Sequence, residues 1–447
     1  MATPPRTAAA ALGPVPRGAL VLAGALPLLF LHVDYQPKLA LRLGDTPLDV
    51  KLSDLALAVI AVTALTAAVQ ARPRLRGFRL LLPGTLFLVL AFAGVLVGAA
   101  SAGVYDTGAH LVSAFVWLEY ATLALAVPLL VRGTGALRAL LWSLAAATAV
   151  LDAAALTQFV GVDWAQASVP GARQPSLIGY HDFAAIGASS LAAGLALVAL
   201  GRAELRQVAT ALCATGFAGT VLAGSVGAAA GLLLAATLVL VAARAAATLD
   251  RRRAATVCTV ALAAVFGVLL LRGGDLGQFG RFLGLLPKEQ TTTRDVQTYS
   301  HRALLVYLGL RVAADHPLVG AGWLATTEYE TLAPYVPDAK ARFPDIAAEA
   351  FPAPGRPHGV QNAYVQVLAE LGPLGLLAFV GALALPLGAG LRTAARGSPA
   401  AVVGMGLLAV CAGVWSALGL VGGVPTLALT CIGVGLVVAA RSAIPDG

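Results

Sequence analysis

Charged residues are scarce in this sequence of 447 residues: Asp, Glu, Lys and Arg together make up 12% of it, whereas hydrophobic residues make up 59%. Soluble domains carry about 25% charged residues, so a water-exposed surface of ordinary charge density cannot be built from this composition. Apolar runs recur from one end of the chain to the other. The sequence therefore excludes an ordinary soluble domain and predicts that lipid is the solvent for much of the chain.

Cysteine and metal-binding motifs are also sparse. All four cysteines fall inside apolar runs, and no Cys-x-x-Cys pair or Cys/His cluster occurs, which argues against a zinc site or a disulfide framework. We interpret the four cysteines as small buried hydrophobic residues. The chain also has no Asp-x-Asp, so a metal-bound nucleotide-sugar site is not favoured, and we predict neither a metal nor another cofactor.

The chain has instead a series of segments long enough to cross a bilayer, which takes about 20 predominantly apolar residues. The first follows Arg6 and Arg17 and has no small-residue cleavage site after it, which indicates a retained helix rather than a signal peptide. We therefore predict an all-α, polytopic integral membrane protein. Its twelve transmembrane helices are expected near residues 18–33, 54–70, 80–100, 111–131, 138–158, 183–201, 208–224, 226–243, 254–271, 361–390, 399–419 and 423–440.

Basic residues alternate along this predicted path. With the N-terminus in the cytoplasm, the cytoplasmic segments hold 17 basic and three acidic residues, whereas the outer segments and adjoining helix ends hold 13 basic and 17 acidic residues. Because cytoplasmic loops carry an excess of Lys and Arg, this pattern favours a multi-pass protein of the inner (plasma) membrane with both termini in the cytoplasm. The same topology explains the net charge of +8 without a nucleic-acid partner.

This path divides the chain into five parts. They are a cytoplasmic N-terminal segment (1–17), nine transmembrane helices (18–271), a large extracytoplasmic loop with short helices (272–360), three more transmembrane helices (361–441) and a cytoplasmic tail (442–447). A long loop in a compact protein is usually functional or disordered, and this one is too hydrophobic for disorder. We therefore expect the functional site at the loop.

Two arginines lie in the helix that the loop sequence predicts over residues 298–314. Arg302 and Arg311 are nine residues apart, which places them on opposite faces of a regular helix. Both therefore cannot line one site. Arg311 is expected either to contact the substrate or to extend to the lipid headgroups.

The start of the helix after the loop is a second candidate region. It carries His358, Gln361 and Asn362, and its N-terminal end faces the extracytoplasmic space in the predicted topology. Unpaired N–H groups at a helix N-terminus favour an anion such as phosphate, so this end is a candidate binding site for the diphosphate. Asn362 is expected either to cap the helix or to contact the substrate.

Three stretches then form a recognisable set. Residues 302–323 (RALLVYLGLRVAADHPLVGAGW) combine an Arg, an apolar helix and a His-Pro-Leu-x-Gly-x-Gly pattern. Residues 358–375 (HGVQNAYVQVLAELGPLG) end the loop and contain a Glu-x-Gly pattern. Residues 222–234 (LAGSVGAAAGLLL), the third stretch, enter a membrane helix, and Gly179-Tyr180-His181-Asp182 before another apolar helix is a weaker likeness. Together with the number of helices and the place of the loop, these stretches resemble the O-antigen ligase and polymerase family of membrane glycan-transfer enzymes.

The resemblance implies an activity in cell-envelope polysaccharide biosynthesis. Members of the family move a glycan from an isoprenoid diphosphate carrier, such as undecaprenyl diphosphate, onto a hydroxyl of a glycan or lipid acceptor in the membrane. Arg stays protonated and forks onto two oxygens, which suits a diphosphate leaving group. His has an unperturbed pKa near 6.5, which suits a base that takes the acceptor proton. Such a periplasmic transfer is expected to need no metal.

The resemblance also implies roles for particular residues. Arg302 is expected to stabilise the diphosphate and His358 to act as the base. The alternatives are that Arg302 is a surface charge at the start of its helix and that His358 is a solvated loop residue. His181, Gln361 and Asn362 are expected to contact the substrate.

Two departures from the family pattern matter. Where the family has Arg after Ser, this chain has Val226, and the missing cation would come from Arg173, Arg281 or Arg294. The family histidine next to Asn is replaced by Gln361, so His358 would have to be presented by the bend between Pro357 and Gly359.

Two other functions compete with this prediction. One is a transferase that uses a polyprenyl-monophosphate sugar, with Asp34 in the first outer loop as its base. The other is a transporter or flippase for a glycolipid or small solute, because twelve helices suit it equally well. Transporters usually place polar sites near the bilayer midplane, often in an internal repeat. Here only Glu119 and Asp152 lie deep in predicted helices and no repeat is evident, which favours the enzyme.

Overall fold

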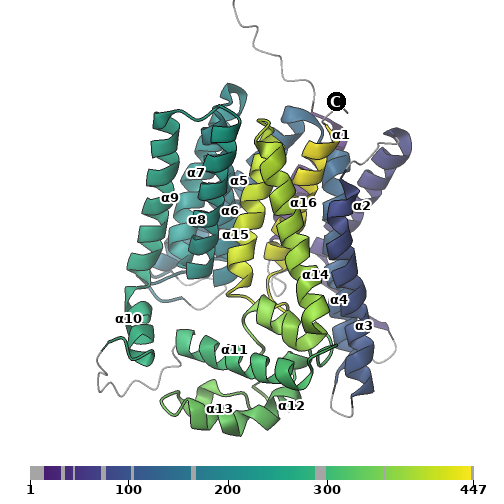
Figure 1. Cartoon of the computed structure of the whole chain (residues 1–447). Helices are drawn as coiled ribbons and strands as arrows, with labels where there is room; N and C mark the ends of the chain where they lie inside the picture. Colours follow the sequence, from purple (N-terminus) through teal and green to yellow (C-terminus); the bar gives the residue numbers. More distant parts are fainter. Residues whose placement is uncertain are drawn as a thin grey trace, which may run out of the picture.

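The computed structural model describes residues 15–31, 36–43, 46–71, 77–101, 105–162, 168–286, 298–356 and 358–443. Each of the twelve segments predicted to be transmembrane holds an α-helix, and these helices stand side by side in one bundle (Figure 1). They are α1 (Arg17–Leu29), α2 (Leu52–Ala71), α3 (Leu82–Ala100), α4 (Thr107–Leu130), α5 (Gly133–Phe159), α6 (Tyr180–Leu200), α7 (Arg206–Ala223), α8 (Val226–Ala245), α9 (Arg251–Leu271), α14 (Ala363–Ala394), α15 (Pro399–Trp415) and α16 (Val424–Ser442).

Nine helices of the described residues are long and apolar enough to cross a membrane. The helices α1, with 13 residues, and α15, with 17 residues, are shorter, and α7 is not among the nine. The chain is therefore an all-helical integral membrane protein, as predicted. Twelve crossings remain a prediction.

Helix α6 lies at the centre of the bundle, and 94% of its apolar span is buried. Its small residues allow the backbone of α7 to approach closely: a Cβ on Gly187 would lie 2.7 Å from the backbone of Gly219, and one on Gly216 would lie 2.2 Å from the backbone nitrogen of Leu191. Small residues at helix interfaces are typical of membrane bundles, where packing replaces the hydrophobic effect between helices. This packing fixes the first turn of α6, which begins at Tyr180.

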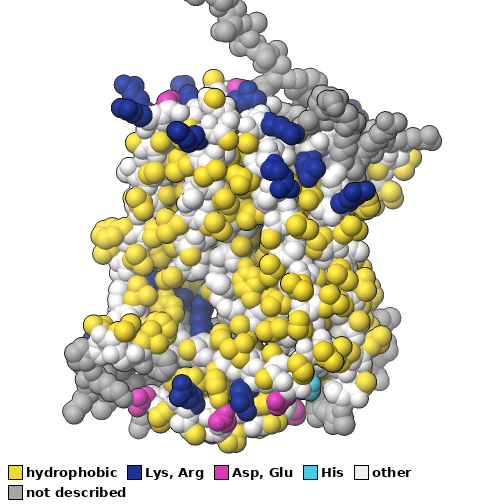
Figure 2. Space-filling model, viewed as in Figure 1, with side chains coloured by type: hydrophobic (Ala, Val, Ile, Leu, Met, Phe, Trp, Pro, Cys, Tyr) yellow, Lys and Arg dark blue, Asp and Glu magenta, His cyan; other side chains and the backbone are white. Residues whose placement is uncertain are grey.

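Charged side chains gather at the two ends of the molecule and leave a hydrophobic belt between them (Figure 2). Arg244 near the end of α8 and Arg251, Arg252 and Arg253 at the start of α9 lie at one end, and the helices of the large loop lie at the other (Figure 1). This arrangement fits the alternation of basic connections. Which end faces the cytoplasm remains a prediction.

The large loop forms a small helical layer across one end of the bundle (Figure 1). It contains α10 (Gly273–Phe282), α11 (Thr298–Asp315), α12 (Tyr329–Leu332) and α13 (Val336–Arg342). Leu304, Leu305 and Leu308 on α11 are fully buried in a separate apolar cluster with Leu332 and Phe351. The layer therefore has its own core, which holds α11 in a defined position.

The structure corrects two details of the all-helical prediction. Strands β1 (Lys38–Leu43) and β2 (Thr46–Lys51) pair as an antiparallel hairpin, with Lys38 opposite Lys51 and Leu41 opposite Leu48. The sequence prediction missed this hairpin because segments this short are hard to recognise from periodicity. The helix expected at 361–390 is α14, which is interrupted at Gly372.

The break in α14 receives a turn of the large loop. Gly372 has φ 68° and ψ −172°, a region open essentially to glycine alone, and a Cβ there would lie 2.3 Å from the carbonyl oxygen of Leu318. A Cβ on Gly320 would lie 2.2 Å from the backbone of Glu370. The Gly-x-Gly and Glu-x-Gly motifs are thus two halves of one backbone contact between the loop and α14.

Candidate active site

A cavity of about 250 Å³ lies between the bundle and the loop layer. In Figure 2 a hollow in the visible face contains dark blue basic side chains below the hydrophobic belt. The cavity is lined by three arginines that come from separate parts of the chain, and no Asp or Glu of the described residues lines it. The lining residues are Arg173, His181, Gly224, Ser225, Val226, Gly227, Ala230, Arg272, Tyr299, Arg302, Ser416 and Ala417.

The start of α8 forms one wall of the cavity. Helix α7 ends at Ala223, Gly224 turns the chain in the left-handed conformation (φ 57°), and Ser225 caps α8 by accepting a hydrogen bond from the Ala228 N–H (3.4 Å). Val226 and Gly227, in the first turn of α8, line the cavity. The N-terminal N–H groups and dipole of α8 therefore favour an anion in this space.

Arg302 reaches the cavity from the first turns of α11. Its Nη2 donates to Nε2 of His181, 2.7 Å away, so this histidine nitrogen acts as an acceptor. Burial, with Arg173 as a further cause, lowers the pKa of Arg302 to about 10, which still leaves it charged at neutral pH. Arg302 is thus a partly buried cation without a carboxylate contact among the described residues.

The other two arginines are held by aromatic rings. The guanidinium carbon of Arg173 lies 4.1 Å from the centroid of the Tyr180 ring, and that of Arg272 lies 5.1 Å from the Tyr299 ring. Arg272 also forms an ion pair with Asp275 (2.8 Å). Burial, followed by the proximity of Arg272, lowers the pKa of Arg173. These like charges repel one another, so an anion in the cavity would be strongly favoured.

His358 lies against a second histidine rather than in the cavity. Its ring is edge-on to that of His301, with 4.8 Å between the centroids, and His301 directly precedes Arg302 on α11. Burial and the neighbouring His358 lower the pKa of His301 to about 4, so His301 is neutral at neutral pH. The histidine pair therefore lies next to Arg302, one of the three arginines that line the cavity.

The other predicted site residues lie apart from the cavity. Asn362 caps α14 by accepting from the Val365 N–H (3.1 Å) and donates to the carbonyl oxygen of Ser416 (3.0 Å). Gln361 precedes this cap and does not line the cavity. Arg311 is half exposed and lies 3.9 Å from Asp338 of α13, on a different face of α11 from Arg302, as the spacing predicts. Roles of these residues in substrate binding remain predictions.

Three predicted residues need separate mention. Arg281 lies on α10 and does not line the cavity. Arg294 and Asp34 lie outside the described residues. Of the two candidates that the structure describes, Arg173 and Arg281, only Arg173 lines the cavity together with Val226.

Sequence reasoning missed Arg272 and Tyr299. Arg272 directly follows α9, where a basic residue at the end of an apolar run is most simply explained as a headgroup contact. Tyr299 lies three residues before Arg302 with no motif around it. A helical-wheel comparison would have placed Tyr299 near the face of Arg302, but nothing in the sequence relates either residue to Arg272.

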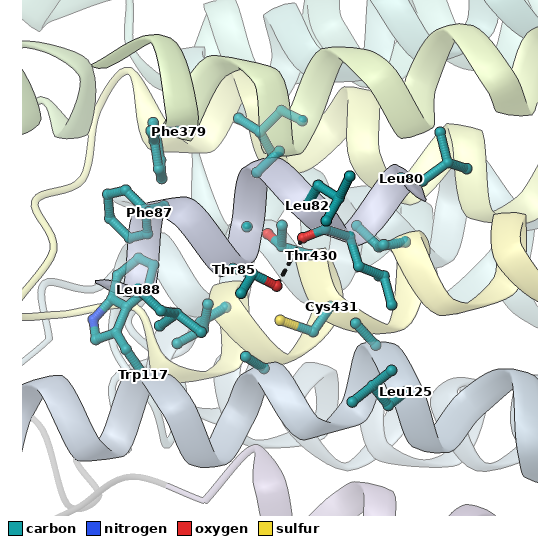
Figure 3. Close-up of a pocket in the computed structure, with 18 of the residues that line it drawn as sticks. Leu80, Leu82, Thr85, Phe87, Leu88, Trp117, Leu125, Phe379, Thr430 and Cys431 are labelled. Carbon is teal, nitrogen blue, oxygen red and sulfur yellow. Dashed lines mark hydrogen bonds between the residues drawn. The ribbon is translucent and has the colours of Figure 1, made fainter. Parts of the chain in front are cut away.

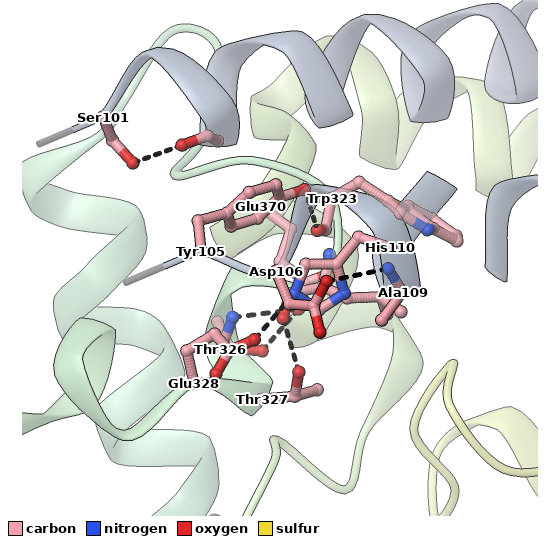
Figure 4. Close-up of polar contacts among 12 residues, drawn as sticks. Ser101, Tyr105, Asp106, Ala109, His110, Trp323, Thr326, Thr327, Glu328 and Glu370 are labelled. Carbon is pink, nitrogen blue, oxygen red and sulfur yellow. Dashed lines mark hydrogen bonds and ion pairs between the residues drawn. The ribbon is translucent and has the colours of Figure 1, made fainter. Parts of the chain in front are cut away.

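A network of polar contacts docks the loop onto the bundle (Figure 4). Glu370 of α14 is fully buried and accepts hydrogen bonds from the backbone N–H groups of Leu324 (3.0 Å) and Thr326 (3.3 Å). The Tyr105 hydroxyl donates to the carbonyl oxygen of Trp323 (2.7 Å), and His110 pairs with Glu328 (2.9 Å). These contacts fix the segment that follows α11, and with it the position of Arg302.

A second cavity, of about 320 Å³, lies between α3, α4, α14 and α16 (Figure 3). Phe87, Trp117 and Phe379 form one end of it, and the described residues that line it are all uncharged. Its lining offers no cation for a diphosphate. The arginine-lined cavity is therefore the candidate active site.

The fold and this site define a class: a polytopic helical membrane protein whose loop layer closes a cationic cavity. Residues 211–380 match the family model described as O-antigen ligase. The matched range runs from α7 into α14 and includes Val226, Arg272, Arg302 and His358. The match confirms the resemblance to an O-antigen ligase-like family of polysaccharide biosynthesis. A comparison with curated proteins finds no match.

Proposed function

We propose that this protein is a glycan ligase or polymerase that transfers a saccharide from an isoprenoid diphosphate carrier to an acceptor hydroxyl. The observation that carries the proposal is the convergence of Arg173, Arg272, Arg302 and the N-terminus of α8 on one cavity, with no carboxylate among the described residues that line it. A diphosphate offers several charged oxygens to such a set, and charge-assisted hydrogen bonds from Arg suit it geometrically.

The reaction follows from this charge distribution. The acceptor oxygen attacks the anomeric carbon of the donor sugar, the bond from that carbon to the phosphate oxygen breaks, and its electron pair leaves with the diphosphate. Negative charge builds up on the leaving oxygen, where the arginines stabilise it. The acceptor proton passes to a base, and no step needs a metal.

His358 is the proposed base. Its neighbour His301 is held neutral by burial, as its lowered pKa indicates, so it adds no repulsion to a proton that arrives on His358. General-base catalysis is typically worth about 10²–10⁴-fold in rate. Gln361, Asn362 and Arg311 lie on the loop side and are proposed to contact the acceptor or the glycan.

The proposed site faces the extracytoplasmic side of the inner membrane. The support is the basic connections at the opposite end of the bundle, which the positive-inside rule assigns to the cytoplasm. In this orientation the loop layer meets a carrier lipid whose diphosphate lies at the membrane surface. A lipid or glycan acceptor would reach the same surface.

The test is reconstitution in lipid vesicles with a labelled isoprenoid-diphosphate oligosaccharide and candidate acceptors. We expect Arg302→Ala to lower transfer by about 10²–10³-fold, as for the loss of other electrostatic contacts to a developing charge, while insertion into the membrane stays intact. Arg342→Ala, an exposed arginine on α13, is the matched control and should transfer normally. Normal transfer by the Arg302 variant would remove this residue from the mechanism.

A further inference from the structure

The pair of Arg272 and Asp275 joins the end of α9 to the first turn of α10 at the edge of the cavity. Nη1 of Arg272 lies 2.8 Å from Oδ2 of Asp275, and its Nε donates to the Tyr299 hydroxyl at 3.4 Å. An Arg guanidinium has five N–H donors, so these two contacts leave others for a ligand in the cavity that Arg272 lines.

The two partners differ in how firmly they are held. The side chain of Arg272 is 4% exposed, whereas that of Asp275 is 37% exposed. The stem of Arg272 also packs near the turn before α8, because a Cβ on Gly224 would lie 3.6 Å from its Cδ. The cation is therefore anchored in the protein, and the carboxylate can turn toward water at little cost.

We infer that Arg272 is a diphosphate ligand and that Asp275 is an exchangeable counterion, displaced when the diphosphate of the donor binds. This inference rests on the proposed function, and it adds a residue pair that acts on the affinity of that site. Asp275 neutralises one of the three cations while the cavity is empty, and it competes with the donor for Arg272. A diphosphate replaces it because it offers more acceptor oxygens and also meets Arg173 and Arg302.

The inference predicts changes of opposite sign for the two partners. We would measure binding of geranylgeranyl diphosphate to the full-length protein in detergent, with geranylgeranyl monophosphate as the comparison. Arg272→Gln should weaken diphosphate binding about tenfold to a hundredfold, since it removes a charge-assisted contact. Asp275→Asn should tighten it about two- to fivefold, the range expected for removing a partly exposed ion-pair partner.

The double variant Arg272→Gln/Asp275→Asn separates competition from structure. If Asp275 acts only through Arg272, the double variant should bind as Arg272→Gln does. Arg251→Gln, at the far end of α9, is the matched control and should bind as the unaltered protein does. Weaker binding by Asp275→Asn would overturn the inference, because the carboxylate would then position Arg272 rather than compete for it.

The outcomes also distinguish this inference from the proposed function. If the unaltered protein binds the diphosphate lipid and Arg302→Ala abolishes binding, but neither Arg272→Gln nor Asp275→Asn changes it, the inference alone fails. If the unaltered protein binds neither lipid, the proposed function fails with it. Equal affinity for the monophosphate and the diphosphate lipid in every variant would likewise overturn the inference that a diphosphate displaces Asp275 from Arg272.

Discussion

Glu370 offers the sharpest test of how the loop holds the candidate site. Its two carboxylate oxygens accept from the backbone N–H groups of Leu324 and Thr326, from the Thr326 hydroxyl and from the side-chain amide of Gln366 (2.9 Å). All of these contacts are buried. Glu370→Ala removes every acceptor at once and leaves the donors in a place that water does not reach.

The structure sets the size of the effect. The Thr326 hydroxyl can rotate to another acceptor, but the two backbone N–H groups are fixed by the turn that they belong to. A buried N–H without an acceptor costs about 1–3 kcal/mol, so Glu370→Ala should lower the free energy of unfolding by about 2–6 kcal/mol. Glu370→Gln keeps one carbonyl oxygen and should lose about half as much.

Glu370→Ala should loosen the loop layer as well as lower the stability of the whole protein. We would record thermal unfolding in detergent and the rate of tryptic cleavage after Lys340 and Arg342, which are exposed on α13. Glu370→Ala should melt earlier and be cleaved faster, and it should lose transfer because α11 no longer holds Arg302 in the cavity. Glu349→Ala, an exposed loop glutamate, serves as the control. Unchanged melting and an unchanged cleavage rate for Glu370→Ala would refute this account of the docking.

Three further predictions concern Gly372, His301 and the metal requirement. Gly372→Ala should destabilise the protein by at least about 1–3 kcal/mol, because its backbone conformation suits only glycine; normal melting would mean that α14 tolerates a regular turn there. Because burial lowers the pKa of His301 to about 4, the unfolded chain binds more protons between about pH 6.5 and 4, so stability should fall as the pH falls through this range. His301→Asn should lose less stability than the unaltered protein between pH 7 and 5 in paired melting curves, and an identical pH dependence would contradict the assignment. Transfer should survive EDTA because the chain has no Asp-x-Asp, and strict dependence on Mg²⁺ or Mn²⁺ would count against the mechanism.

Much of the architecture was predictable because its signals are local. A run of about 20 apolar residues can be satisfied in a bilayer only as a helix, so each predicted segment corresponds to a helix of the bundle. Arg302 and Arg311 lie on different faces of α11 because the helical period fixes their angle. The family motifs were recognisable for the same reason, as short patterns of Gly, Pro, His and Arg.

The exceptions show where local signals fail. The hairpin of β1 and β2 was missed because its strands are only six residues each. The break in α14 was missed because glycine is common in membrane helices, and only the contact of Gly372 with Leu318 makes it a requirement. Glu370 was recognised as part of a motif, but its structural role depends on backbone N–H donors in the loop that lie 44 and 46 positions away along the chain.

The sequence by itself determined that lipid surrounds much of this protein, where its helices lie and which family it resembles. Hydrophobicity and motif spacing are local signals, which a few turns of chain are enough to show. Only the tertiary structure decided which cations share a site. An arginine at the end of an apolar run is the same in the sequence whether it meets a lipid headgroup or a buried ligand. Arg173, Arg272 and Arg302 differ from the arginines at the ends of the helices because packing of the bundle against the loop layer brings them to one cavity.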